Sequence, residues 1–144
     1  MDTFDIFVTP TSLYLNGERL KRIYTNSSRR IYRNKDYVVK VEWDEDRDGM
    51  WQCRKEKRLW KRFPMQHRKF FVPILLAVHT KEYDYVVQPR VKIRFEKNIE
   101  KRQKAWDYII GDLSQRYNLN DLFVSLQHNW GFCNGQPLIV DYGC

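Results

Sequence analysis

Glycine, cysteine and histidine are all scarce in this chain. Its 144 residues include six glycines, three cysteines and three histidines. No CxxC pair and no Cys/His cluster occurs, so the ligand spacing of a structural zinc site is excluded. Cys53, Cys133 and Cys144 are odd in number and far apart along the sequence. We therefore expect free thiols in a reducing compartment.

Long apolar runs are missing as well. The longest, FFVPILLAV, has the length of a strand and contains a proline, whereas a helix that spans a bilayer needs about 20 apolar residues. The N-terminal residues MDTFDIFVTP are acidic and lack the charged-then-apolar order of a signal peptide. We expect a soluble, cytoplasmic protein with no membrane partner.

Positive charge, by contrast, is plentiful. The chain carries 26 Lys and Arg against 18 Asp and Glu, a net charge of +8. This excess favours polyanionic or acidic partners, such as nucleic acid, nucleotide phosphates or an acidic protein face, without choosing among them. Hydrophobic residues make up 42%, which is enough to form the core of one compact domain or of two small lobes.

Short apolar segments and polar turns in the first half predict an antiparallel meander with one helix. SLYLNGERL surrounds the dipeptide Asn16-Gly17, which is a strong signal for a tight hairpin. KRIYTNSSRRIYRNKDYVVKVEW continues the pattern through two polar turns. A helical period then follows Asp48, a residue type that caps helices, and ends at Pro64. KFFVPILLAVH and YDYVVQPRV predict two further strands.

The second half has a helical pattern followed by a hairpin. From about Ala105 the segment AWDYIIGDLSQRY is amphipathic, and WGFCNGQPLIVDYG predicts a hairpin around Asn134-Gly135. The chain therefore has an α+β layout. We predict an antiparallel sheet with one helix over residues 1–90 and a minimal helical lobe with a terminal hairpin over residues 91–144.

Two charged residues stand out in the first half. Lys40 lies in VVKV, and a lysine in such a strand is costly to bury unless it meets an anion. The alternative is an edge lysine that points to solvent. Glu56, on the predicted helix, is the natural counter-charge. Its alternative is a surface glutamate that pairs with basic neighbours one turn away.

A polar turn and a terminal hairpin carry the other candidate residues. The turn TNSSRR offers backbone N–H groups and the hydroxyls of Ser27 and Ser28 to a phosphate, although it also suits an ordinary hairpin loop. Asn129 and Asp141 flank the hairpin and supply the oxygen ligands that Mg²⁺ prefers. The alternative for Asp141 is a plain turn after a strand.

The order of these features resembles the protein-kinase-like fold, including its small bacterial and phage-encoded members. The resemblance covers about residues 20–143. It implies that Lys40 holds nucleotide phosphates and that Glu56 is its partner on the helix. It also implies that Thr25 to Arg29, with Ser27 and Ser28, form the turn over the phosphates.

The same resemblance implies a nucleotide and a metal. Gln88 to Val91 correspond to the hinge that meets adenine, while Asn129 and Asp141, in HNWG and DYG, correspond to the residues that bind the metal. ATP and Mg²⁺ are therefore the implied ligands.

The chain departs from the kinase pattern at three places. The kinase pattern has a catalytic Asp five residues before the Asn, but Val124 stands there, and an apolar side chain cannot accept the proton of a substrate hydroxyl. The phosphate-covering turn contains no glycine. The sequence also stops one residue after DYG, so we expect a truncated protein without a substrate platform.

Three functions remain open at this point. The favoured one is a degenerate, pseudokinase-type protein of phage origin that binds a host protein or other macromolecule in the host cytoplasm and binds Mg-ATP. The second is a minimal active protein kinase. The third is a nucleic-acid-binding protein that uses its basic surface. The sequence leaves open the partner's identity, the oligomeric state and any replacement for the Asp missing at Val124.

Overall fold

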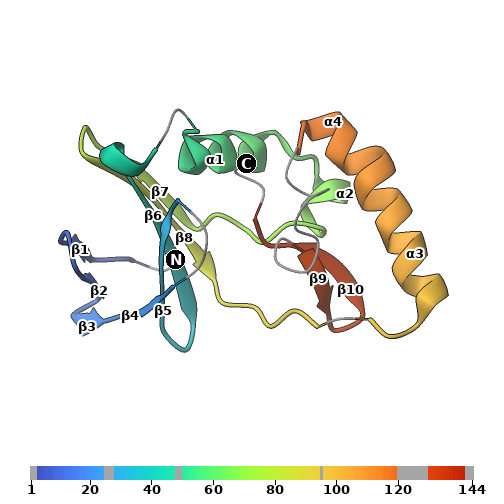
Figure 1. Cartoon of the computed structure of the whole chain (residues 1–144), viewed down its shortest axis with the longest axis horizontal. Coiled ribbons are helices and arrows are strands. Elements are labelled where there is room, and N and C mark those ends of the chain that lie inside the picture. Colours follow the sequence, from blue (N-terminus) through green and yellow to red (C-terminus); the bar gives the residue numbers. More distant parts are fainter. Residues whose placement is uncertain (1–2, 25–27, 48–49, 95, 120–129, 142–144) are drawn as a thin grey trace.

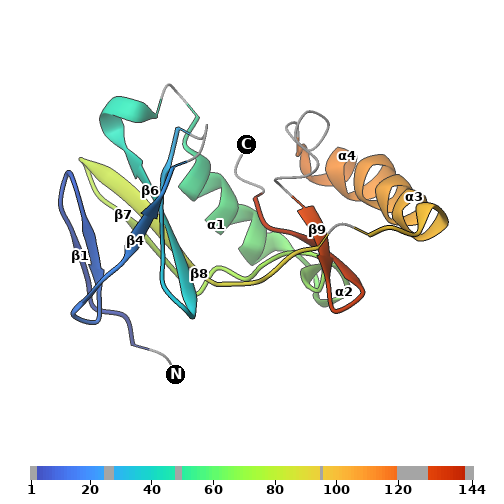
Figure 2. The same ribbon diagram turned by 60° about the horizontal axis from the view of Figure 1, so that its bottom comes forward.

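A five-stranded antiparallel sheet organises the protein. The computed structural model describes residues 3–24, 28–47, 50–94, 96–119 and 130–141. A small three-stranded sheet covers one face of the five-stranded sheet and helix α1 covers the other, while a hairpin lies between this part and a long helical run (Figure 1; Figure 2). The predicted α+β class is confirmed.

The chain consists of groups of short strands separated by helical segments. The strands of the first half are β1 (Ile6–Val8), β2 (Leu13–Leu15), β3 (Glu18–Arg19), β4 (Lys21–Ile23), β5 (Arg30–Arg33), β6 (Tyr37–Trp43), β7 (Leu76–His79) and β8 (Tyr83–Pro89). Between β6 and β7 lie the 3-10 turn η1 (Asp44–Asp46) and the helices α1 (Gln52–Arg62) and α2 (Met65–Arg68). The second half contains α3 (Ile99–Tyr108), the π-helical stretch η2 (Ile109–Ser114), α4 (Gln115–Tyr117), β9 (Trp130–Cys133) and β10 (Gln136–Ile139).

Both Asn-Gly hairpins form as predicted. Asn16 and Gly17 join β2 to β3 with φ of 51° and 82°, and Asn134 and Gly135 join β9 to β10 with φ of 51° and 78°. Two successive residues with positive φ match the right-handed twist of the flanking strands, which explains the choice of Asn-Gly. The predicted meander is also present, with strand order β4-β5-β6-β8-β7.

Strand β6 divides its side chains between the two faces of the sheet, because alternate residues of a strand point to opposite sides. Val39 and Val41 belong to a core cluster that also takes in Leu13 from β2. Lys40 and Glu42, in the other phase, are buried where α1 covers the sheet. We call these the outer and inner faces of the sheet.

The helical run begins earlier than the sequence predicted. It starts at Ile99 rather than near Ala105, because the Asn98 side chain accepts a hydrogen bond from a backbone N–H of the first turn at 3.1 Å. The predicted amphipathic face is present, with Ile109 and Leu113 fully buried. Within the described ranges, no helix is long and apolar enough to cross a bilayer.

The β9–β10 hairpin is attached to the rest of the chain along both of its edges. On one side Val72 N donates to Ile139 O at 3.0 Å, and Ile139 N donates to Phe70 O at 2.7 Å. On the other side Arg94 N donates to Phe132 O at 2.7 Å. These bonds hold the residues that follow β10 beside the inner face of the sheet.

Candidate functional site

Lys40 and Glu56 meet on the inner face of the sheet. Lys40 of β6 is 7% exposed and Glu56 of α1 is fully buried, and Lys40 Nζ lies 3.4 Å from Glu56 Oε2. Both surface alternatives are therefore wrong. A lysine and a glutamate buried together offset part of the cost of removing each charge from water.

Arg29, which directly precedes β5, adds a second cation to this pair. It is 2% exposed. Its Nη1 donates to Glu56 Oε1 and its Nη2 donates to Asp141 Oδ1 at 2.8 Å. Burial alone would lower the pKa of the guanidinium, but the charges of Glu56 and Asp141 outweigh burial and hold this pKa well above its ordinary value. Arg29 therefore stays charged and ties α1 to the segment after β10.

The same segment also contacts the lysine. Lys40 Nζ donates to the carbonyl oxygen of Val140 at 2.8 Å. Lys40, Arg29, Glu56 and Asp141 thus form one cluster with two positive and two negative charges, which we call the inner-face cluster. Its charges balance, as buried ionic groups require.

Glu42 fixes the start of α1 against the sheet. Its carboxylate accepts hydrogen bonds from Gln52 N at 2.8 Å and from Cys53 N at 3.3 Å. The first N–H groups of a helix have no partner within the helix, so this strand residue acts as the cap from outside. The cap residue predicted from the sequence, Asp48, lies outside the described residues.

A second buried carboxylate lies directly opposite the first. Asp84 of β8 pairs in register with Glu42 of β6, and two like charges at such positions repel each other. Asp84 is neutralised by Arg54 Nε at 2.9 Å and Arg47 Nη2 at 3.2 Å. The Trp51 ring lies 4.2 Å from one guanidinium and 4.5 Å from the other. These contacts hold α1, and hence Glu56, in place.

Cys53 is a packing residue of this region. Burial raises the pKa of its thiol to about 12, so the thiol stays neutral and is a poor nucleophile. The predicted free thiols are confirmed for Cys53 and Cys133, while Cys144 lies outside the described residues.

The residues predicted for the phosphate turn and the metal are only partly described. The Ser28 hydroxyl accepts a hydrogen bond from Gln52 Nε2 at 2.8 Å, which joins the turn to the start of α1. Ser27, Asn129 and Val124 lie outside the described residues. Of the predicted metal ligands, the structure therefore places Asp141 alone.

The predicted hinge follows directly from the central strand β8. Gln88 is 2% exposed, and its Nε2 donates to Val72 O at 3.5 Å, so its side chain is used in packing. Val91 is half-buried in the chain that leaves β8. The intervening Arg90 N donates to Asp36 O at 2.8 Å, which anchors this exit to the β5–β6 turn.

Comparison with known proteins identifies the fold of this chain. No protein-family model matches the chain, and no curated protein matches its sequence. Among solved structures, the Legionella pneumophila Lpg2603 kinase bound to IP6 is 15% identical and superposes with a TM-score of 0.50, over 96% of this chain and 59% of that one. The chain has a protein-kinase-like fold. The predicted resemblance is confirmed.

Two structures of another protein show the same likeness more weakly. The bifunctional kinase-methyltransferase WbdD is 17% identical, with a TM-score of 0.46 over 81% of this chain and 29% of that one. WbdD with the kinase inhibitor LY294002 is 15% identical, with a TM-score of 0.45 over 87% and 33%. This chain therefore spans between 29% and 59% of the lengths of the three structures.

The kinase-like fold implies a divalent metal, and the described residues do not fit one. Asp141, the one predicted ligand that is described, already accepts a hydrogen bond from the Arg29 guanidinium. A divalent cation added beside that guanidinium would be repelled by it. In the part of the chain that is described, no group of three or more His, Cys, Asp or Glu side chains could hold a metal ion.

Sequence reasoning missed Glu42, and it placed Arg29 in the phosphate-covering turn without predicting its pairing with Glu56 and Asp141. The alternation of side chains along the predicted strands would have indicated both residues. Glu42 follows Lys40 by two residues and so shares its face, and Arg29 precedes Ile31, which pairs with Lys40 in register, by two residues. Reading the faces of the predicted meander together would have placed both residues beside the lysine.

Proposed function

We propose that this kinase-like protein binds ATP at the inner-face cluster. The observation that carries the proposal is the buried Lys40–Glu56 pair, joined through Arg29 to Asp141. Nucleotide phosphates need fixed cations in a site shielded from water, and kinase-like folds supply them between the sheet and the segment after it. Lys40 and Arg29 are the two cations that this chain provides.

The phosphates would share the two cations with the carboxylates that already contact them. Lys40 Nζ contacts Glu56 at 3.4 Å, a long separation for an ion pair, and Arg29 presents a guanidinium fork of the geometry that binds phosphate. Glu56 is fully buried and must keep a counter-charge, so the phosphates compete with it for the same cations. We expect modest affinity for this reason.

We further propose a pseudokinase-type role, in which the protein acts by binding a macromolecule of a host cell. Its support in the sequence is Val124, which stands where a kinase has its catalytic base. Its support in the structure is a set of exposed cations on α1 and α3, namely Arg58, Lys61, Lys101 and Lys104. The test compares how much host protein or nucleic acid is captured by the wild type and by the double variant Arg58→Glu, Lys61→Glu. Equal capture by the two proteins would argue against a role for the α1 surface.

A thermal-shift titration with ATP tests the nucleotide site. Ligand that binds only the folded state raises the melting temperature, and the stabilisation grows with the logarithm of the ratio of its concentration to Kd. We expect millimolar ATP to raise it for the wild type and to leave Lys40→Met unshifted. The variant should fold, because Arg29 still pairs with the buried Glu56.

Two control variants show whether loss of the ATP-induced shift is specific to Lys40 or follows from any change of surface charge. Lys61→Met removes an exposed lysine from the last turn of α1, and Asp107→Asn removes an exposed carboxylate from α3. Both should keep the full ATP shift. An absent shift in the wild type, or an equal loss in Lys61→Met, would rule out the site at Lys40.

A slow phosphotransferase is the second candidate, favoured by the Lys40–Glu56 pair that is already formed. Positioning and charge neutralisation supply most of the catalysis in phosphoryl transfer, and a missing general base costs about 10²- to 10⁴-fold. Transfer of the ATP γ-phosphate to the protein or to a generic substrate, abolished by Asp141→Asn, would support this candidate. Transfer that survives the substitution would point to a contaminating kinase.

A further inference from the structure

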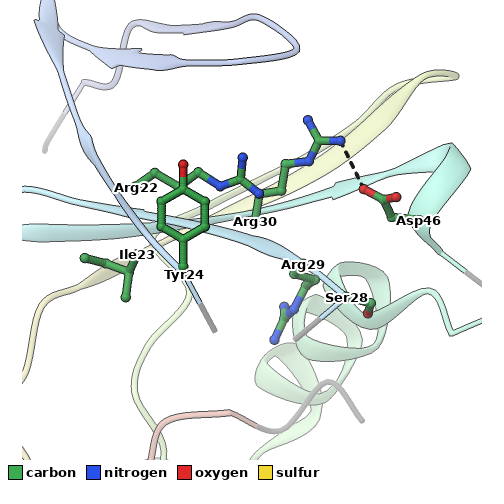
Figure 3. A pocket seen from close by; sticks show the side chains of 7 residues that line it. All are labelled: Arg22, Ile23, Tyr24, Ser28, Arg29, Arg30 and Asp46. Atoms are coloured by element: carbon green, nitrogen blue, oxygen red, sulfur yellow. Dashed lines mark hydrogen bonds and ion pairs between the residues drawn. The ribbon is translucent and has the colours of Figure 1, made fainter. Parts of the chain in front are cut away.

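Two adjoining hollows lie beside the β4–β5 hairpin. One has a volume of about 380 Å³; it is lined by Arg22, Tyr24 and Arg30 and also reaches Ser28 and Arg29, which precede β5 (Figure 3). The second, of about 390 Å³, shares Arg22 and Tyr24 and reaches Arg19 and Tyr32. Figure 3 shows Arg22, Tyr24 and Arg30 on one side of the hairpin ribbon, with the Arg29 side chain on the other.

Two buried hydrogen-bond donors that line these hollows have no partner among the described residues. Arg22 Nε and the Tyr32 hydroxyl are both buried and make no hydrogen bond within the described ranges. The two residues face each other across β4 and β5 in register, so their side chains share the outer face. Tyr32 is 1% exposed. A donor buried without an acceptor is destabilising, so a ligand that supplies acceptors would be favoured here.

The charge around the hollows is positive. Neither Arg19 nor Arg22 forms an ion pair with any described carboxylate. Arg22 lies over the Tyr24 ring at 4.6 Å, which holds its guanidinium flat against the hairpin. Asp46 is the single acidic residue of the lining, and it already pairs with Arg30 at 3.2 Å.

Arg30 is held rigidly at the boundary of the site. Its Nη1 donates to Pro10 O at 2.6 Å, and its Nη2 lies 3.2 Å from Glu45 as well as from Asp46. A guanidinium fixed in this way loses little conformational freedom when an anion arrives. Arg22 lines the same hollow as this fixed arginine, and Arg19 lines the second hollow.

We propose that the two hollows form one binding site for a chain of linked phosphates. The unpartnered groups can both donate, the surrounding charge is positive, and guanidinium groups bind phosphate oxygens in a planar, two-pronged geometry. Two joined hollows suit several phosphate groups better than one. Lys40 lines neither hollow, although Arg29 of the inner-face cluster lines one of them, so a Lys40 variant can distinguish this site from ATP binding at the inner-face cluster.

Isothermal titration of the full chain with inorganic tripolyphosphate tests this site. We expect saturable binding that Arg22→Gln weakens by about tenfold or more, the usual scale for a charged hydrogen bond. Tyr32→Phe keeps the buried ring and removes the hydroxyl, and we expect it to weaken binding by roughly fivefold. Circular dichroism and melting temperature show whether each variant remains folded.

The matched control is Arg33→Gln. Arg33 belongs to the same strand, β5, but lies in the opposite phase from Arg30 and Tyr32 and lines neither hollow. It should bind tripolyphosphate as tightly as the wild type. Equal weakening by Arg33→Gln and Arg22→Gln would reduce the site to a general attraction for anions, and no saturable binding by the wild type would overturn it outright.

A further variant distinguishes this site from the proposed nucleotide site. Lys40→Met should retain tripolyphosphate binding, because Lys40 lines neither hollow. Loss of binding in Lys40→Met would place the anion at the inner-face cluster and overturn the site in the hollows. Titration with ATP, tripolyphosphate and orthophosphate shows whether the site takes the phosphates of a nucleotide or a free phosphate chain. Binding of orthophosphate as tight as that of tripolyphosphate would contradict a site for linked phosphates.

Discussion

Arg29 shows at the scale of one residue how this chain differs from the kinase pattern it resembles. The resemblance assigns Asp141 to a metal ion, yet the structure gives that carboxylate an arginine at 2.8 Å. A guanidinium provides fixed positive charge without a bound ion, and it can hydrogen-bond directly to phosphate oxygens. At the proposed ATP site, Arg29 would therefore supply the positive charge that magnesium supplies in the kinase pattern.

If Arg29 takes the place of the metal ion, ATP binding at the proposed site should depend little on Mg²⁺. We expect Kd values for ATP measured by titration calorimetry in EDTA and in excess Mg²⁺ to agree within about threefold, since the fixed cations Lys40 and Arg29 supply the charge. Arg29→Gln should bind ATP more weakly and should regain part of the loss in Mg²⁺, because it removes the positive charge beside the Asp141 carboxylate that would repel a metal ion.

Arg29→Lys is the companion variant, because it keeps the charge and removes the fork. We expect it to retain independence from Mg²⁺ with lower affinity than the wild type. If EDTA abolishes ATP binding by the wild-type protein, the magnesium site implied by the kinase resemblance stands, and Arg29 does not replace the metal.

At the scale of the element, helix α1 is fixed to the sheet at its first turn. Glu42 caps its N–H groups from β6, and Asp84 holds Arg54 from β8. Since Glu56 belongs to the same helix, the orientation of the inner-face cluster depends on these contacts. We infer a helix that stays against the sheet rather than swinging away from it.

Substituting Glu42 by Gln should loosen this end of α1. The carboxylate becomes neutral and loses its attraction for the helix terminus, which destabilises the fold by about 1–2 kcal/mol. Denaturant unfolding measures that loss, and hydrogen exchange should show faster exchange in the first turn of α1. Glu45→Gln is the control, because its side chain is 72% exposed and a surface pair contributes about 0–1 kcal/mol. Equal effects of the two substitutions would contradict the capping role.

The elements differ in how well the sequence predicted them. The Asn16-Gly17 and Asn134-Gly135 hairpins were predictable because the backbone they need is set by the dipeptide itself. The pairing of Lys40 with Glu56 was predictable because the strand and the helix that carry them are close in sequence. The bond between Arg29 and Asp141 joins residues 112 positions apart, and no local pattern specifies it. It exists because the β9–β10 hairpin packs against the chain between α2 and β7.

At the scale of the whole molecule, helix α1 connects two hydrophobic clusters, because it contributes to one of them and is fixed by polar contacts to the sheet that carries the other. One cluster lies between the two sheets, and the other packs the helical run against the β9–β10 hairpin. Leu59 and Phe63 of α1 belong to the second cluster, although the start of α1 is capped from the first half. The division of the chain at residue 90 therefore stays a prediction.

This connection through α1 predicts one cooperative unfolding transition. Leu13 and Leu113 are both fully buried, one in each cluster. We expect Leu13→Ala and Leu113→Ala each to destabilise the protein by about 2–5 kcal/mol and to shift the same single transition. Differential scanning calorimetry distinguishes the outcomes. Two resolved transitions, of which Leu113→Ala lowers only one, would show that residues 1–90 and 91–144 fold as separate units.

The hydrogen bond from Lys40 to the carbonyl of Val140 spans 100 positions of the sequence. During synthesis the meander and α1 emerge from the ribosome long before that carbonyl exists. Until the β9–β10 hairpin emerges and docks, the lysine and Arg29 have only part of the set of partners found in the folded protein. A nascent chain can therefore build its sheet early, whereas the inner-face cluster is completed only when the segment after β10 has been translated.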